Sequence, residues 1–379
     1  MSEGGDRASI LSDLNLRLVD GLRSKGVPKR IARAFAQVPR HRFIPDQVWD
    51  ERGNEVKRST ALEDWYRLVY SDVPIVTQHD DGCEGGRGLA TSSSSAPSVM
   101  AAMLDAAVVE PHMHVLEIGA ATGYNAALLC ELTGDAESVT TVEVDAALAG
   151  QARASLAAAG YHPRVVTGDG ALGCPDSGPF DRVIATCAVS RVPEPWIAQT
   201  HDGGLVVCPW APSSGLPGGL LARLMVRDGV AEGEFTRPLS FMWLRGQRGD
   251  HSPPHDLGAE AGTVRHVEQD PQPFLLNGAQ ALPLALMVPA WRFGMRGTPD
   301  GSPLVWVSAL DSPSWARLHT DRVEQGGPRQ LWDEFEAAHQ WWREHGRPPA
   351  TEFGLTVDAD GHRVWLGTPE GPTWIHRVR

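Results

Sequence analysis

The stretch VLEIGAATGYNAALL, residues 115–129, joins a short apolar run to a helical pattern through a turn that contains two glycines. The run predicts a buried strand ending at Glu117, and the chain then turns through Gly119, Ala120, Ala121, Thr122 and Gly123. Glycine lets the backbone approach a ligand closely at the carboxyl end of a strand, where doubly wound sheets bind. A dinucleotide fingerprint would read GxGxxG. The GxxxG spacing here suits instead a ligand with a small zwitterionic amino-acid tail.

Strand and helix patterns alternate on both sides of this turn. The expected strands are 114–119, 138–144, 163–168, 181–186 and 204–210, and the expected helices are 96–109, 123–132, 146–160 and 194–200. Such alternation indicates βαβ units and an α/β fold with a parallel, doubly wound sheet. Two further β-like runs, 221–228 and 235–245, are expected to close the sheet as a hairpin-like edge.

The region before residue 91 is predicted to be helical with a substrate loop. One face of residues 9–25 carries Ile10, Leu14, Leu18 and Leu22, which predicts an amphipathic helix, and a second helix starts near Pro28. Residues 50–90 have few apolar runs and are expected to be irregular. They end in the glycine-rich loop QHDDGCEGGRGLA (78–90), which is typical of a lid or substrate loop.

A change of character follows residue 246. Residues 247–262 are rich in Gly, Pro and charge and are predicted to be a linker. Eight of the 13 tryptophans lie after residue 250, and residues 330–346 show a helical stripe of Trp332, Phe335, His339 and Trp342. This stripe fits core packing and also peptide docking. The expected organisation is therefore 1–90 helical and loop region, 91–246 catalytic domain, 247–262 linker and 263–379 a Trp-rich α+β module that docks peptide.

Composition restricts the class of protein. The 379 residues carry a net charge of -13, which disfavours nucleic acid as a partner. The five cysteines are scattered and form no CxxC pair. The sequence also shows no secretory signal and no apolar run of membrane-spanning length, so we expect a cytoplasmic protein without a membrane partner. Cys83 fits an exposed thiol better than a nucleophile, because no His partner can be assigned. His112 and His114 lack a third ligand, so no metal is expected.

Polar or glycine residues follow the other predicted strands as well. Glu143, followed by Val144, ends the second strand at the distance where an acid reaches a ribose diol. Asp169 ends the third strand and is placed to accept from an exocyclic amine, with Gly170 giving the base room. Thr186 ends the fourth strand beside the same crevice. Together these strand ends describe one nucleoside pocket.

The tract TSSSSAPS, residues 91–98, precedes the helix expected from residue 96. Helix capping at Ser95 or Ala96 before Pro97 accounts for one hydroxyl. The hydroxyls of Ser93, Ser94 and Ser95 are also suited to bind a carboxylate at the helix N-terminus without neutralising it. A polar loop with only a capping role is the alternative for these serines.

These motifs occur in the order found in the protein-L-isoaspartate O-methyltransferase family, which the region from about residue 28 to 245 resembles. The matching segments are Val38–Pro45 (VPRHRFIP), Ser93–Pro97, Glu117–Tyr124, Glu143, Gly168–Gly173, Pro179–Ala188 and Val192–Gly204. The resemblance implies a SAM-dependent methyltransferase (Rossmann-like) fold with S-adenosyl-L-methionine as the cofactor. Two departures are present: Ala121 replaces a glycine of the turn, and the serine tract replaces the family's usual context.

The resemblance also implies residue roles. Ser95, with Ser94 and Ser93, takes the position beside the methyl-accepting carboxylate. Glu117 and the turn from Gly119 to Tyr124 take the methionine part of the cofactor, Glu143 the ribose, and Asp169 with Gly170 the adenine. A carboxylate is ionised at neutral pH, so its methylation needs alignment and no general base. Such alignment can contribute about 7–11 kcal/mol toward the barrier.

The serine tract, the CPW ending of the fifth strand and the aromatic C-terminal region resemble actinobacterial methyltransferases of ribosomal-peptide maturation. The resemblance is stronger to the enzymes associated with ATP-grasp ligases (graspetides) than to those associated with lanthipeptides. The C-terminal region is expected to be absent from the plain repair enzyme. The predicted function is methylation of an aspartate in a modified precursor peptide, followed by closure to an aspartimide. A general L-isoaspartyl repair enzyme and a non-catalytic SAM-binding scaffold are the alternatives, and the oligomeric state stays open.

Overall fold

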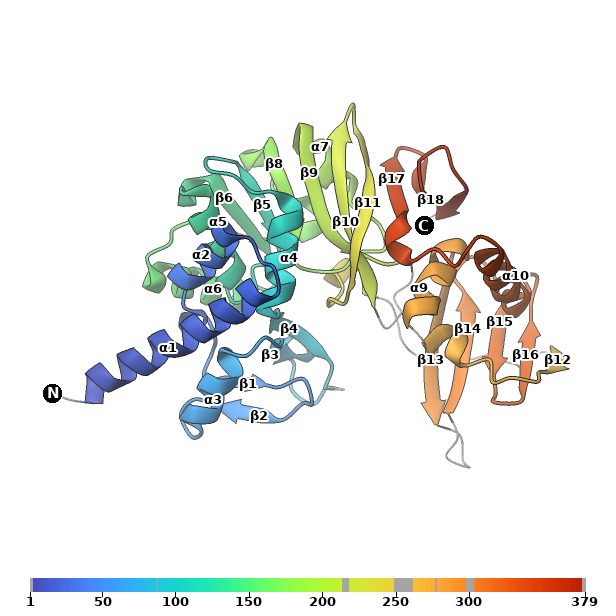
Figure 1. Cartoon of the computed structure of the whole chain (residues 1–379), viewed down its shortest axis with the longest axis horizontal. Coiled ribbons are helices and arrows are strands. Elements are labelled where there is room, and N and C mark those ends of the chain that lie inside the picture. Colours follow the sequence, from blue (N-terminus) through green and yellow to red (C-terminus); the bar gives the residue numbers. More distant parts are fainter. Residues whose placement is uncertain are drawn as a thin grey trace. The chain divides into compact units, whose positions relative to one another are not determined.

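A computed structural model describes residues 3–86, 88–212, 218–248, 262–276, 278–297 and 303–376. The described chain forms two compact units (Figure 1). Unit 1 comprises Met1–Cys187 and Pro193–Cys208, and unit 2 comprises Ala188–Val192 and Pro209–Arg379. The boundary between the units at Cys208 differs from the predicted boundaries after residues 90, 246 and 262. The division into four segments stays a prediction. Most of the predicted linker, residues 249–261, lies outside the described residues.

Unit 1 contains a parallel sheet with the strand order β9-β8-β5-β6-β7. Its strands are β5 (Val115–Ile118), β6 (Val139–Glu143), β7 (Arg164–Thr167), β8 (Phe180–Ala185) and β9 (Thr200–Trp210). The order runs outward in both directions from the neighbours β5 and β8, so the topological switch point lies between these two strands. The predicted doubly wound α/β fold is confirmed.

Four helices pack around this sheet. The helices are α4 (Pro97–Ala107), α5 (Tyr124–Thr133), α6 (Ala146–Ala159) and α7 (Glu194–Ala198). Three of them, α5, α6 and α7, connect successive strands of the sheet. α5 and α6 pack on β6, and α4 packs on β8. Local sequence sets their ends: Asp145 caps α6 through the backbone N–H groups of Ala147 and Leu148, and Gly160 ends it in the left-handed region.

The two predicted N-terminal helices are α1 (Glu3–Ser24) and α2 (Lys29–Gln37). α2 packs against α4 and α5, and α1 packs against α2 (Figure 1). The predicted apolar face of α1 is buried only in its second half. Leu18 and Leu22 are buried, whereas Ile10 is 57% exposed.

Residues 47–94 form a layer of their own, so the expectation of an irregular segment is wrong. The strands β1 (Gln47–Trp49), β2 (Glu55–Lys57), β3 (Ile75–His79) and β4 (Ala90–Ser94) make an antiparallel sheet in the order β2-β1-β3-β4. Helix α3 (Leu62–Val69) contributes Trp65 and Val69 to the core of this layer. Two strands are three residues long and β4 reads ATSSS, so neither length nor hydrophobic alternation marks them.

Unit 2 contains the predicted hairpin of β10 (Gly219–Arg227) and β11 (Val230–Leu239). A second hairpin is formed by β17 (Phe353–Asp358) and β18 (Gly361–Leu366). β17 pairs with β11, and β19 (Thr373–His376) pairs with β18. The last strands of the chain therefore extend the β10–β11 hairpin, so the prediction that this hairpin closes the sheet as its edge is wrong.

A five-stranded antiparallel sheet makes up the rest of unit 2. Its order is β12 (Thr263–His266), β16 (Arg322–Gly326), β15 (Trp315–Leu318), β14 (Pro303–Ala309) and β13 (Trp291–Gly297). Helix α10 (Leu331–Glu344) packs on this sheet and on α9 (Gly278–Met287), which follows α8 (Pro273–Leu276). Trp332 is 2% exposed, and Phe335 meets Trp291 edge-on at 4.8 Å. The first half of the stripe is core, whereas Trp342 is half-buried.

Two buried histidines pair across β18 and β19 in unit 2. Nε2 of His362 accepts from the backbone N–H of Val192 at 2.9 Å, and Nε2 of His376 contacts the carbonyl of Leu286 at 2.8 Å. Burial lowers the pKa of each imidazole to about 4. Both rings are therefore neutral in the folded protein near neutral pH.

We expect stability to fall as pH drops from about 6.5 toward 4. The unfolded chain takes up protons below the ordinary histidine pKa of about 6.5, whereas the folded rings resist protonation down to about 4. The loss is on the order of 2–3 kcal/mol per histidine at the acid end. Urea unfolding across this range checks it. His376→Gln flattens the pH dependence, and the exposed control His345→Gln does not; equal slopes in all three proteins contradict the assignment.

Candidate active site

The switch point of the parallel sheet brings together three of the predicted residues. In the sheet register, Ile118 lies opposite Val142 and Ala185, so Gly119, Glu143 and Thr186 follow at the same level. Thr186 donates through Oγ1 to the carbonyl of Gly119 at 2.7 Å. A Cβ on Gly119, whose φ is +98°, would lie 2.6 Å from that hydroxyl. Glycine is therefore required where the two strand ends meet.

Glu143 connects two turns through its carboxylate. Oε2 accepts from the backbone N–H of Ala121 at 2.9 Å, and Oε1 accepts from that of Asp145 at 3.1 Å. Ala121 adopts a φ of +45°, which glycine would adopt more readily. The turn thus forms with alanine in place of the family's glycine, and the bond to Glu143 holds it in this conformation.

Glu117 is fully buried below the turn. It accepts from Asn125 Nδ2 at 2.8 Å and from Thr141 Oγ1 at 2.5 Å. Burial raises the pKa of Glu117 to about 7, against the lowering effect of these two hydrogen bonds. A cationic amino group bound nearby would be paired with this carboxylate and would favour its ionised form.

The predicted adenine end is more open. Asp169 is exposed and accepts from the backbone N–H of Ala171 at 2.9 Å, which fixes the turn of Gly170. The carbonyl of Gly170 accepts from Trp196 Nε1 at 2.8 Å. Val144 is 40% exposed and offers an apolar surface next to Glu143. These positions are compatible with a base lying along the carboxyl edge of the sheet.

The rest of the predicted turn is buried. Ala120 and Thr122 are buried, and Gly123, with a φ of +82°, lies close to Leu156 of α6. The ring of Tyr124 packs against Phe35 at 6.1 Å and Phe43 at 5.5 Å. Its side chain therefore faces the N-terminal helical layer, so only the backbone of Tyr124 is suited to touch a cofactor in the turn.

Ser92, Ser93 and Ser94 lie on a strand, and Ser95 lies between this strand and Ala96, the N-cap of α4. β4 places Ser92 and Ser94 on its buried face, whereas Ser93 and Ser95 are half-buried. Ser94 is 3% exposed, and its Oγ accepts from Arg40 Nε and Nη2 at 3.3 and 3.2 Å. Ser93 and Ser95 are thus the more accessible serines of the tract, and Ser94 is held inside the protein.

The N-terminus of α4 already carries an anion. Ala96 is its N-cap and has no side-chain hydrogen bond, so Ser95 does not cap the helix. Asp72 accepts from the backbone N–H of Ser98 at 2.8 Å and pairs with Lys25. Burial raises the pKa of Asp72, but the bonds from Lys25 and Ser98 outweigh it and leave the pKa below its ordinary value. The helix end therefore does not offer the substrate carboxylate the free dipole expected from sequence.

A chain of hydrogen bonds connects the hairpin of β3 and β4 to the strand ends. Thr91 Oγ1 donates to Gln78 Oε1 at 3.0 Å, and Gln78 Nε2 donates to Asp145 Oδ2 at 3.1 Å. Asp145 in turn donates through its backbone to Glu143. Sequence reasoning missed the parts of Gln78 and Asp145. The signal available was the Asx cap at Asp145, directly after the acid of β6.

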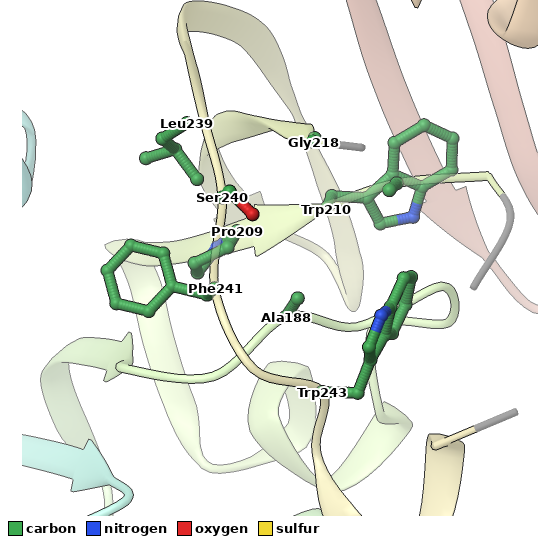
Figure 2. Close-up of a pocket in the computed structure, with 10 residues that line it drawn as sticks. Ala188, Pro209, Trp210, Gly218, Leu239, Ser240, Phe241 and Trp243 are labelled. Atoms are coloured by element: carbon green, nitrogen blue, oxygen red, sulfur yellow. The ribbon is translucent and has the colours of Figure 1, made fainter. Parts of the chain in front are cut away.

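A separate small cavity lies in unit 2. Figure 2 shows Ala188 with Phe241 and Trp243 on either side, and Pro209, Trp210 and Leu239 also line the cavity. Its volume is about 20 Å³, enough for one water molecule or methyl group. It is too small to hold a nucleoside, so it does not compete with the strand ends as a cofactor site.

The profile of the family described as protein-L-isoaspartate(D-aspartate) O-methyltransferase (PCMT) matches residues 13–216. The chain belongs to this family. A protein-L-isoaspartate O-methyltransferase of Thermococcus sibiricus is 35% identical over 198 residues, 51% of this chain and 76% of the relative. One of Hyperthermus butylicus is 32% identical over 248 residues, 62% of this chain and 89% of the relative.

The family confirms the prediction of a SAM-dependent carboxyl O-methyltransferase. A solved protein-L-isoaspartate O-methyltransferase structure shares the fold, with a TM-score of 0.56 and 23% identity over 93% of this chain and 100% of its own. This alignment extends past residue 250, so the C-terminal region does not by itself separate this chain from such enzymes. No helix in the described part of the chain is long and apolar enough to cross a membrane. The individual site residues stay predictions.

We expect Glu143→Gln to weaken binding of S-adenosylhomocysteine about 10- to 100-fold, because hydrogen bonds to a charged acceptor contribute about 1.5–3 kcal/mol. The amide retains the shape of the side chain but has one acceptor oxygen in place of two. Isothermal titration calorimetry measures the change, with Glu137→Gln on the exposed 3-10 turn before β6 as the control. Equal affinity in both variants would remove Glu143 from the cofactor site.

Proposed function

We propose that this enzyme methylates the side-chain carboxylate of an aspartate in a ribosomally made, modified precursor peptide of the graspetide type. The resulting ester then closes to an aspartimide. The observation that carries the proposal is the hydrogen-bonded connection from Thr91 through Gln78 and Asp145 to Glu143. It joins the strand of the serine tract to the strand ends predicted to hold the cofactor.

The geometry of the strand ends supports the following assignment of cofactor residues. Glu117 and the backbone of Gly119–Gly123 would hold the methionine part of S-adenosyl-L-methionine, and Thr186 would support that turn. Glu143 has lone pairs left for the ribose hydroxyls after its two backbone bonds. Val144, Asp169 and Gly170 would surround the adenine. The cofactor supplies a methyl group on a cationic sulfur when it is bound.

The half-buried hydroxyls of Ser93 and Ser95 would hold the acceptor carboxylate by donating to one oxygen, which leaves the other for attack. No general base is required, because the carboxylate is ionised near neutral pH. An oxygen lone pair forms the new C–O bond, and the carbon–sulfur bond breaks toward sulfur. The neighbouring amide nitrogen of the peptide then attacks the ester carbonyl, loses its proton and expels methanol.

A general repair activity on L-isoaspartyl peptides is the second candidate. The names of the related proteins favour it, and so does the alignment of a solved family member across most of this chain. The serine tract favours the dedicated substrate, because this departure from the family lies on the substrate side and not on the cofactor side. The two candidates share the chemistry and differ in the peptide.

Mass spectrometry after incubation with S-adenosyl-L-methionine separates the candidates. We expect a modified precursor peptide to gain the mass of one methylene and then to lose one methanol. Generic isoaspartyl peptides should react much more slowly. Ser95→Ala should lower the rate about 10-fold or more through loss of alignment, whereas Ser12→Ala on the exposed face of α1 should not. Fast methylation of generic isoaspartyl peptides and slow methylation of the precursor would establish repair instead.

A further inference from the structure

Arg40 lies behind the serine tract with its guanidinium fully buried. Nη1 donates to the carbonyls of Val69 and Ser71, at 3.2 and 3.1 Å. Nη2 lies 3.2 Å from the carbonyl of Val73 and 3.0 and 2.9 Å from those of Ser94 and Ser95. One side chain thus joins the segment that enters β3 to the segment that leaves β4.

None of these hydrogen-bond acceptors is a carboxylate. Burial lowers the pKa of Arg40 to about 10, although the negative charge of Asp72 and the nearby Tyr124 act in the opposite direction. The group remains a cation at neutral pH. Burying a cation is costly, but an apolar side chain here would leave five backbone carbonyls and the Ser94 hydroxyl without this donor. Packing alone therefore does not explain an arginine at this position.

Four of the seven hydrogen bonds of Arg40 end on Ser94 and Ser95, beside the proposed site of the acceptor carboxylate. Two successive carbonyls, of Ser94 and Ser95, point at the same nitrogen, and the Ser94 hydroxyl accepts from both Nε and Nη2. The planar guanidinium fixes these directions in a way that a lysine ammonium cannot reproduce. The orientation of the Ser95 hydroxyl depends on the backbone that Arg40 holds.

We propose that Arg40 is a positioning residue for methyl transfer, which holds the Ser94–Ser95 backbone so that the Ser95 hydroxyl orients the acceptor carboxylate. This inference rests on the proposed function and adds the residue that aligns its acceptor. Transfer cancels the charges of carboxylate and sulfonium, so a cation that lies closer to the carboxylate than to the sulfonium stabilises the reactants more than the transition state. The charge of Arg40 would thus favour binding of the carboxylate. The fixed directions of its guanidinium donors would favour the rate of transfer.

Arg40→Lys separates these two effects because it retains the charge and loses the fork. We expect the affinity for S-adenosylhomocysteine to stay within about 3-fold and kcat to fall about 10- to 100-fold, since small misplacements of reactants cost that much. KM for the peptide should change less than kcat. Hydrogen–deuterium exchange should rise at residues 92–99. Arg42→Lys, at an exposed position two residues on, is the matched control and should change none of these.

Unchanged exchange at residues 92–99 and a wild-type kcat in a folded Arg40→Lys enzyme would overturn the proposal. Should this variant fail to bind S-adenosylhomocysteine, Ser94→Ala decides, because it removes the hydroxyl that accepts from Nε and Nη2 and leaves the bonds to the carbonyls. A lower kcat with intact cofactor binding supports positioning, and a wild-type kcat rejects it. A wild-type enzyme that methylates no peptide carboxylate refutes the proposed function, whereas the exchange measurement still tests Arg40.

Discussion

The carboxylate of Glu143 fixes the turns that follow β5 and β6. It accepts from backbone N–H groups in two different strand-to-helix turns, those of Ala121 and Asp145. An acid here therefore shapes the turn after β5 before any ligand arrives. The bond also accounts for a turn that tolerates alanine at a positive φ, because the conformation is secured from the neighbouring strand.

Residues of the N-terminal layer hold the strand that carries the serines in place. Methyl transfer to a carboxylate needs the two reactants in line and needs no general base. Accurate placement of the reactants is therefore the main requirement. Gln78 bonds to Asp145 and thereby fixes the β3–β4 hairpin against the strand ends. Arg40 fixes the other end of β4 through the Ser95 carbonyl. The strand of the serine tract is held at both ends by side chains from outside the tract.

The parallel sheet could be predicted because strand and helix patterns alternate along the sequence and polar or glycine residues follow the strands. Glu143 and Gly119 occupy the expected level because parallel strands align their carboxyl ends, and register follows from that. The small antiparallel sheet was missed because β4 is a run of small polar residues whose strand character comes from pairing with β3. The place of the Tyr124 ring in the core could not be predicted, because sequence does not show that Phe35 and Phe43 pack on it. The anion at the start of α4 was missed because Asp72 is distant from Ser98 in sequence.

The central claim is that one cofactor lies between Glu143 and the serine tract. A crystal structure with S-adenosylhomocysteine and a peptide substrate tests it most directly. The account predicts the ribose hydroxyls on the Glu143 carboxylate and the sulfur facing the hydroxyl of Ser95, with the peptide carboxylate between them. Cofactor density away from the ends of β5 and β6, or a serine tract turned from the sulfur, would contradict it.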